Sequence, residues 1–568
     1  MGFEESNSMS LFDRTFHPDE ANQAFTTGRL IENGVYQYNP SDHHGPTLYY
    51  AAAAIQKAAG NTSVQSIDGT LLRCTPLLFG ILTLLFSFLA LSKILKKVSG
   101  GWLIAAAFVL LLGTSPIFAF FATDFIQEML LACFTAMIFW AAAGYALSGE
   151  VGGKSKIKPG TWALLGGISA GLAFATKETS LLTFGAMAIP TISAILYCKG
   201  TGLRPEPQRN AVVDGRKNAP TQNRLEDLQL TSNDKGTGLR PEPQRKAPGH
   251  DKGTGRSSEH RIRNAALPSH LILGVAGFFL TAVLFYSSFA QNWQGVYNAF
   301  VTAPLSYIYR AAGDAASEGA AYHVHPWWQY LKWLFGGNAA FASFSAIGML
   351  VGVYIFQKDR AENKIPVALK AGFIAISGFA LSLTAIYSGI PYKTPWCALQ
   401  MHIPLLLAGF LGWLLGAMRG KAGRVAVFAV SATVVYWNVS IVKKMWYDPD
   451  SKEIAYNYAS ASPQVKDMAK LIEDAVSAKK DDDAQSFVAV AVPSEDTWPL
   501  PFYLRKLDAR VGYWTTFEEL EALAALGRKP DVVVVPAEQG HLVQPLFPHL
   551  KNTKRFEMRR RVRIRVFW

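Results

Sequence analysis

Charged side chains are scarce in this chain. Only 17% of its 568 residues are Asp, Glu, Lys or Arg, whereas soluble globular proteins carry about a quarter. Half of the residues are hydrophobic and 12% are aromatic. This shortage of charge excludes an ordinary soluble domain, and the composition is typical of a membrane protein.

Cysteine is also rare, because the chain has only four. Each lies in or at the end of an apolar run, which favours core packing over a disulfide framework or a zinc site; they are Cys74, Cys133, Cys198 and Cys397. A Gly-rich phosphate loop is missing from the C-terminal part, so the sequence does not support a bound nucleotide there.

Long apolar runs dominate what is present. About ten are seen, most of them long enough to cross a hydrocarbon core of roughly 30 Å. They lie at 71–91, 103–121, 125–147, 162–176, 179–198, 271–290, 339–356, 367–387, 398–418 and 425–442. The loops rich in Lys and Arg alternate with loops that are poor in them, so all basic loops fall on one side. Because basic loops stay cytoplasmic, we predict a multi-pass protein of the cell (inner) membrane.

The organisation changes outside these runs. Residues 199–268 are rich in Pro, Gly and Arg and contain a near repeat, KGTGLRPEPQR, so we predict a disordered cytoplasmic insertion. An anionic-lipid or RNA tether is the alternative, but a solvated insertion is favoured and no nucleic-acid partner is inferred. In residues 445–568, SFVAVAV and DVVVVP are typical of buried strands, and 463–479 and 516–526 have helical patterns.

The predicted fold is therefore an all-α polytopic membrane domain with a small C-terminal α/β domain. Residues 1–70 form an outer-face loop region, 71–444 the transmembrane domain and 445–568 an extracytoplasmic domain. Residues 1–16 contain no apolar segment that could carry the N-terminus across. We expect a further spanning helix upstream of this reading frame, with reversed insertion by the first helix as the alternative.

Ionisable residues gather on the predicted outer side, where their common placement indicates a shared cavity. They are Asp19, Glu20, His43, His44, Asp124, Glu128, Lys177, Glu178, His323, His325 and Lys393. Asp124 and Glu128 are one turn apart if both lie on one helix.

Simpler interpretations remain open for several of them. Asp124 is also suited to cap a helix that begins at Phe125. Lys177 and Glu178 could form a self-neutralising pair at a helix end. His323 and His325 lack a convincing third metal ligand, so an interfacial loop anchored by the adjacent tryptophans is favoured over a metal site.

The motif HPDEANQA, followed by HHGPTLYY, resembles the first outer loop of GT-C membrane glycosyltransferases, including the protein O-mannosyltransferases and aminoarabinose lipid A transferases. GLAFATKETSLL, YSGIPYKTPW and TWPLPFYLR are similar to signatures of one branch, the flippase-activity-associated family. The resemblance covers nearly the whole chain apart from 199–268. The transferases often carry a lysine in the first loop where this chain has Gly45.

The resemblance implies an inverting transfer of a sugar, mannosyltransferase-like, from a polyprenyl-phosphate carrier to a glycan, lipid or protein acceptor. Asp19 would be the base, with Glu20 beside it in the catalytic motif. His43, His44, Asp124, Glu128, Lys177, Glu178 and Lys393 would bind substrate or lipid phosphate. No cofactor is assigned, and a divalent metal is left open. The alternative is a non-catalytic flippase-associated protein or a transporter of lipid-linked sugars, and either would contact membrane lipids.

Overall fold

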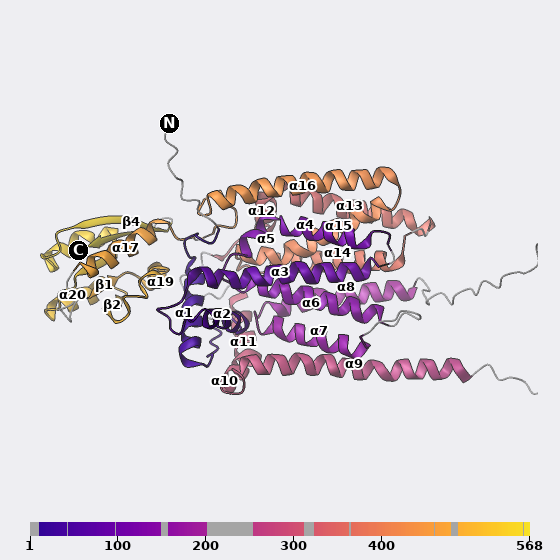
Figure 1. Cartoon of the computed structure of the whole chain (residues 1–568), viewed down its shortest axis with the longest axis horizontal. Helices are drawn as coiled ribbons and strands as arrows, with labels where there is room; N and C mark the ends of the chain where they lie inside the picture. Colours follow the sequence, from indigo (N-terminus) through magenta and orange to yellow (C-terminus); the bar gives the residue numbers. More distant parts are fainter. Residues whose placement is uncertain are drawn as a thin grey trace, which may run out of the picture.

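The computed structural model describes residues 11–41, 44–96, 98–148, 157–200, 254–311, 323–362, 365–451, 453–458, 460–478, 487–559 and 562–568. Long helices run side by side to form a bundle, and a small unit built on a β-sheet lies beyond one end of it (Figure 1). This arrangement confirms the predicted fold class of a helical membrane domain with a small C-terminal α/β unit.

The bundle contains every apolar run that the sequence indicates. Its helices are α3 (Gly69–Ile94), α4 (Gly101–Gly113), α5 (Pro116–Phe121), α6 (Glu128–Leu147), α7 (Pro159–Phe174), α8 (Ser180–Gly200), α9 (Thr254–Tyr286), α13 (Ala339–Glu362), α14 (Val367–Gly389), α15 (Ala398–Ala417) and α16 (Lys421–Tyr447). Shorter helices α10 (Trp293–Tyr297), α11 (Ala303–Ala311) and α12 (Gln329–Gly337) lie between α9 and α13.

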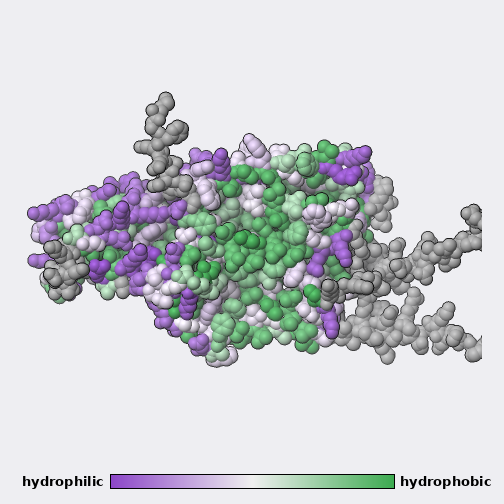
Figure 2. Space-filling model, in the orientation of Figure 1, coloured by the Kyte–Doolittle hydropathy of each residue, from purple (hydrophilic) through white to green (hydrophobic). Residues whose placement is uncertain are grey.

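Seven helices in the described part of the chain are long and apolar enough to span a membrane. The other three predicted runs correspond to α4 with α5, to α7 and to α8. Run 103–121 is divided between α4 and α5, because Pro116 starts a new helix. Run 162–176 ends with α7 at Phe174, and run 179–198 corresponds to α8. Apolar side chains also cover much of the face of the bundle that Figure 2 shows. With the seven apolar helices, this makes the chain an integral membrane protein.

The insertion predicted at 199–268 overlaps a helix at its C-terminal end. Residues 201–253 lie outside the described residues, but α9 already begins at Thr254, fifteen residues before the apolar span at Ser269. The segment RSSEHRIRNAAL itself has no Gly or Pro, and α9 continues from it through Pro268 into the apolar span.

The N-terminal region is also more ordered than a loop. It contains α1 (Pro18–Asn33) and α2 (Thr47–Ala58). Pro18 occupies the first helical position of α1 and Gly34 ends the helix with a left-handed φ of 72°, a conformation that glycine adopts without strain. Both helices lie at the end of the bundle that faces the C-terminal sheet (Figure 1).

The C-terminal unit has a five-stranded sheet in the order β2-β1-β3-β5-β4. Its strands are β1 (Val488–Ala491), β2 (Val511–Trp514), β3 (Val532–Pro536), β4 (Thr553–Arg559) and β5 (Val562–Phe567). Strand β1 pairs in parallel with β2 and β3, and β5 runs antiparallel to β3 and β4. The predicted strands and helices are found here as β1, β3, α17 (Gln464–Ser477) and α20 (Phe517–Ala525). Helices α18 (Ser494–Thr497) and α19 (Leu500–Leu504) connect β1 to β2.

Small residues let α13 and α15 cross at close range. A Cβ atom on Gly412 would lie 1.9 Å from the carbonyl oxygen of Gly348, and one on Gly409 would lie 2.5 Å from the Cα atom of Ser345. Small residues at such crossings allow helix backbones in membranes to approach each other. The crossing therefore requires glycine at these positions.

We predict that Gly412→Ala lowers the free energy of unfolding by about 1–3 kcal/mol, because the added methyl group must separate two packed backbones. Thermal unfolding in detergent measures the effect. Gly372→Ala in α14 is the matched control, since its methyl group would meet no atom within 4 Å. Equal melting temperatures for the two variants would contradict the packing.

Candidate active site

Helix α1 starts with a capping box that separates the two adjacent carboxylates of the HPDE motif. The Nδ1 atom of His17 accepts a hydrogen bond from the backbone N–H of Asp19 at 3.1 Å. The Oε2 atom of Glu20 accepts one from the backbone N–H of His17 at 3.0 Å. Such reciprocal bonds satisfy N–H groups that a helix start leaves without partners. The cap turns Glu20 inward and leaves Asp19 at the surface.

Glu20 is fully buried in an ion pair with Arg73 of α3. Arg73 donates from Nε to Oε1 at 2.9 Å and from Nη2 to Oε2 at 2.7 Å. The backbone N–H of Phe125 also donates to Oε1 at 2.9 Å. Burial alone would raise the pKa of Glu20, but Arg73 and Arg14 hold it at about 2. Glu20 is therefore ionised, and both of its oxygens are engaged in joining α1 to α3 and to the turn before α6.

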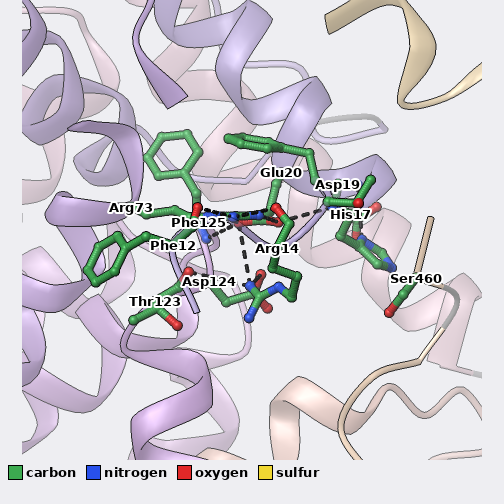
Figure 3. Close-up of polar contacts among 12 residues, drawn as sticks. Phe12, Arg14, His17, Asp19, Glu20, Arg73, Thr123, Asp124, Phe125 and Ser460 are labelled. Carbon is green, nitrogen blue, oxygen red and sulfur yellow. Dashed lines mark hydrogen bonds and ion pairs between the residues drawn. The ribbon is translucent and has the colours of Figure 1, made fainter. Parts of the chain in front are cut away.

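Asp124 belongs to the same buried cluster (Figure 3). Arg14 donates from Nη2 to Oδ1 of Asp124 at 2.9 Å. Burial and the charge of Glu20 raise the pKa of Asp124 above its usual range, against the opposing effect of Arg14. The predicted helix cap is wrong, because α6 begins at Glu128 rather than Phe125 and Asp124 is not on that helix. Its partner comes from a segment more than a hundred residues earlier, which local sequence could not indicate.

Asp19 lies outside this cluster, next to His17 (Figure 3). Its side chain is 47% exposed, and its Oδ2 atom is 3.8 Å from Nδ1 of His17. The His17 ring meets the edge of Trp396, with 5.7 Å between ring centroids. Asp19 is also close enough to His323 to raise the pKa of that imidazole, although burial has the larger effect and lowers it overall. Asp19 is thus a solvent-accessible carboxylate beside histidines and an indole.

A short antiparallel bridge holds the loop of His323 against the loop of Lys393. The backbone N–H of Lys393 donates to the carbonyl of His323 at 2.8 Å, and that of His325 donates to Pro391 at 3.0 Å. The Lys393 side chain is buried, and its ammonium donates to the carbonyls of Ile390 and, at 3.3 Å, His325. Burial lowers the pKa of Lys393. The bridge places this cation next to the segment that borders Asp19.

The two histidines pack against aromatic rings. His323 lies 4.9 Å from Tyr392 between ring centroids, and His325 lies 5.4 Å from Trp333. Trp327 and Trp328 are both exposed. Among the described residues, no group of three His, Cys, Asp or Glu side chains is placed to hold a metal ion.

The remaining predicted residues form two further pairs. Lys177 forms an ion pair with Glu128. Burial alone would lower the pKa of Lys177, but the charge of Glu128 outweighs this effect and raises that pKa. Glu178 is paired with His44, at 2.9 Å from its Nδ1 atom, and also accepts from Tyr38. The predicted Lys177–Glu178 pair is therefore wrong, because the turn between α7 and α8 points the two side chains to different partners. His43 lies outside the described residues.

Sequence reasoning missed Arg14 and Arg73, the two cations of the buried cluster. Arg73 could have been identified from the sequence, because it is the third residue of the apolar run at 71–91, where a charged side chain requires a partner. Arg14 had no comparable signal, since it precedes α1 in a mixed polar segment.

The fold is that of a polytopic membrane protein, and it is similar to solved structures of membrane proteins. The crystal structure of ArnT from Cupriavidus metallidurans bound to undecaprenyl phosphate matches with a TM-score of 0.56 and 13% sequence identity, over 99% of this chain and 95% of that one. The same protein in the apo state matches with a TM-score of 0.51 and 14% identity over the same shares. No family model matches the chain. No curated protein sequence matches it either.

Replacing Glu20 by Gln is expected to destabilise the protein by about 3–5 kcal/mol, because Arg73 would remain buried without its counter-charge. Thermal unfolding in detergent measures this loss at pH 7. The pKa of Glu20 is lower in the folded protein than its unfolded value of about 4.3. The ionised Glu20 therefore contributes its full stabilisation of the folded state above a pH of about 4.3, and this stabilisation is lost as the pH falls toward 2.

Asp19→Asn provides the control on the adjacent residue. Its exposed side chain should change stability by less than about 0.5 kcal/mol. A Glu20→Gln variant as stable as Asp19→Asn at neutral pH would disprove the structural role of Glu20.

Proposed function

We propose that this protein is a membrane glycosyltransferase that transfers a sugar from a polyprenyl-phosphate carrier to an acceptor on the outer face of the membrane. The observation that supports this most directly is the contrast between the two adjacent carboxylates. Asp19 is exposed, with its Oδ2 atom 3.8 Å from Nδ1 of His17, whereas Glu20 is buried and paired with Arg73. One carboxylate is free to react and its neighbour holds it in position.

Asp19 suits the role of general base. A sugar or serine hydroxyl is a poor nucleophile, and a carboxylate within hydrogen-bond reach assists by taking its proton. In the proposed step, the acceptor oxygen forms a bond to the anomeric carbon while its proton passes to Asp19. The bond between that carbon and the phosphate oxygen breaks, and the lipid phosphate leaves with the electron pair. Glu20 is then a positioning residue rather than the base.

The leaving phosphate requires a positive charge nearby. Lys177 and His44 each have a carboxylate partner, and Arg73 is held by Glu20. The described contacts of the Lys393 ammonium are instead to backbone carbonyls. Because an adjacent anion favours the charged form of a lysine, a lipid phosphate would strengthen the charge that burial weakens. We therefore assign Lys393 to phosphate binding.

The similarity to ArnT supports the same proposal at the level of fold. That structure was determined with undecaprenyl phosphate bound, and the match extends over nearly the full length of both chains. A bundle of this kind can accommodate a polyprenyl tail. We propose a mannose-like donor sugar, as the resemblance implies.

Asp19→Asn should reduce sugar transfer by about 10²–10⁴-fold, the usual contribution of a general base. The measurement is transfer of radiolabelled sugar from polyprenyl-phosphate donors by the purified full-length protein in vesicles. Glu32→Gln is the matched control, because it removes a charge from the same helix while the amide oxygen can still accept from Val64.

A different result would contradict the proposed enzyme activity. If the wild-type protein moves lipid-linked sugar across the vesicle membrane without forming any new glycosidic bond, the transporter alternative replaces the enzyme.

Lys393→Met should raise the KM for the lipid donor about tenfold or more, while Lys393→Arg retains part of the affinity because it keeps the charge. Initial rates at varied donor concentration measure the effect. The exposed Lys332 provides a control as Lys332→Met. A change in kcat with no change in donor KM would contradict a phosphate-binding role.

A further inference from the structure

A cavity of about 370 Å³ lies where α1 meets the C-terminal unit. The second half of α1 and the segment that follows α2 form one wall, through Phe25, Arg29 and Gln65. Helices α18 and α19 and the edge strand β2 form the other. Small-molecule sites span roughly 300–1,000 Å³, so this cavity has the volume for a small ligand.

Aromatic rings provide flat apolar surfaces in this cavity. Trp498 is half-buried and meets the edge of Phe25, with 5.6 Å between ring centroids and an interplanar angle of 84°. Trp514 and the 45% exposed Tyr513 of β2 line the same wall as Trp498. A Cβ atom on Gly512 would lie 2.4 Å from the Trp514 ring, so glycine at this position lets the indole lie across the strand. Glycine at position 512 therefore leaves room for this ring orientation.

Polar side chains also line the cavity, where some stabilise its wall and others are available to a ligand. Arg505 strengthens the wall, because its Nη2 donates to the carbonyl of Ile67 and its Nη1 to that of Phe502, both at 2.7 Å. Arg29 is exposed at the cavity and is available to donate to a ligand. Gln65 and Ser494 add uncharged donors and acceptors.

We propose that this cavity binds carbohydrate, and that it holds a sugar unit of the acceptor. A sugar ring has apolar C–H faces that pack on indole and phenyl rings, while hydroxyls around its edge require planar or hydroxyl partners. The residues that line the cavity provide both aromatic rings and polar partners. A lipid tail would leave Arg29 and Gln65 without partners, which is costly when they are desolvated.

The cavity shares α1 with the proposed base, and the acceptor role rests on the proposed function. Phe25 follows Asp19 by six positions and Arg29 by ten, so they lie about 9 and 15 Å further along the helix axis. A glycan of more than one unit could therefore place one sugar in the cavity and extend toward Asp19.

Strand β2 suggests an extended peptide as another occupant, because an edge strand can pair with an added chain. Among the described strands, β2 pairs only with β1 and has four residues. Arg29 and Gln65 come from other elements and would not contribute to such pairing. The lining as a whole therefore favours a sugar.

The test is direct binding to the full-length protein in detergent. Saturation-transfer NMR and calorimetry would use mannobiose, chitobiose and lactose as probes, without any lipid donor. We expect at least one to bind with a Kd below about 10 mM, and Trp498→Ala to weaken it at least about tenfold. Arg29→Ala should weaken it severalfold, and because Arg29 is exposed this variant does not depend on tolerance of a core change. Lys529→Ala, at an exposed cation away from the cavity, should leave binding unchanged.

The proposal falls if no probe binds to the folded wild type, or if binding is equally strong in the Trp498 and Arg29 variants. It also falls if an extended peptide binds at this site and excludes the sugars. In transfer assays, Arg29→Ala should raise the KM for the acceptor without changing the KM for the donor. Sugar binding together with absent transfer would remove the proposed enzyme activity while leaving the carbohydrate site in place, so the two failures are distinguishable.

Discussion

The ion pair between Glu20 and Arg73 is the interaction on which the arrangement of this site depends. It joins the first turn of α1 to α3, and through Phe125 and Arg14 it also holds the turn before α6. A carboxylate and a guanidinium that are both fully buried are strongly destabilised when separated. Helix α1 is thereby fixed to the bundle at one end, where Asp19 is exposed.

The segment just before α1 also links the bundle to the C-terminal unit. Phe16 stacks on Phe502 with 4.3 Å between ring centroids, and its backbone N–H donates to Tyr503 at 3.0 Å. Arg505 adds a hydrogen bond to the segment after α2. One short helix consequently carries the proposed base at its start and one wall of the carbohydrate cavity further along, so changes in the C-terminal unit can alter the position of the acceptor relative to the base.

Much of the fold follows from patterns within single segments. The long apolar runs correspond to bundle helices, and VAVA and VVVV became buried strands, because chain length and apolarity determine these elements locally. Pro18 and Glu20 are typical of a helix start, yet we predicted a loop region here. The helix Thr254–Tyr286 began earlier than predicted, and the segment RSSEHRIRNAAL before its apolar span has no Gly or Pro.

The sequence alone did not indicate which of the site residues pair with each other. The motif DE marked an important carboxylate pair, but its division into an exposed and a buried member depends on Arg73, and the partner of Asp124 is Arg14. Lys177 and Glu178 are neighbours in sequence and still bond to Glu128 and His44. These contacts join residues separated by 49 to 134 positions, and hydrophobic periodicity contains no information about them.

The most direct measurement is a cryo-EM structure of the full-length protein with a polyprenyl-phosphate sugar bound. We expect the anomeric carbon beside the exposed carboxylate of Asp19, with the phosphate next to Lys393 and the Glu20–Arg73 pair intact. A donor bound with its phosphate away from Asp19, or a sugar that contacts Glu20 in place of Arg73, would contradict it.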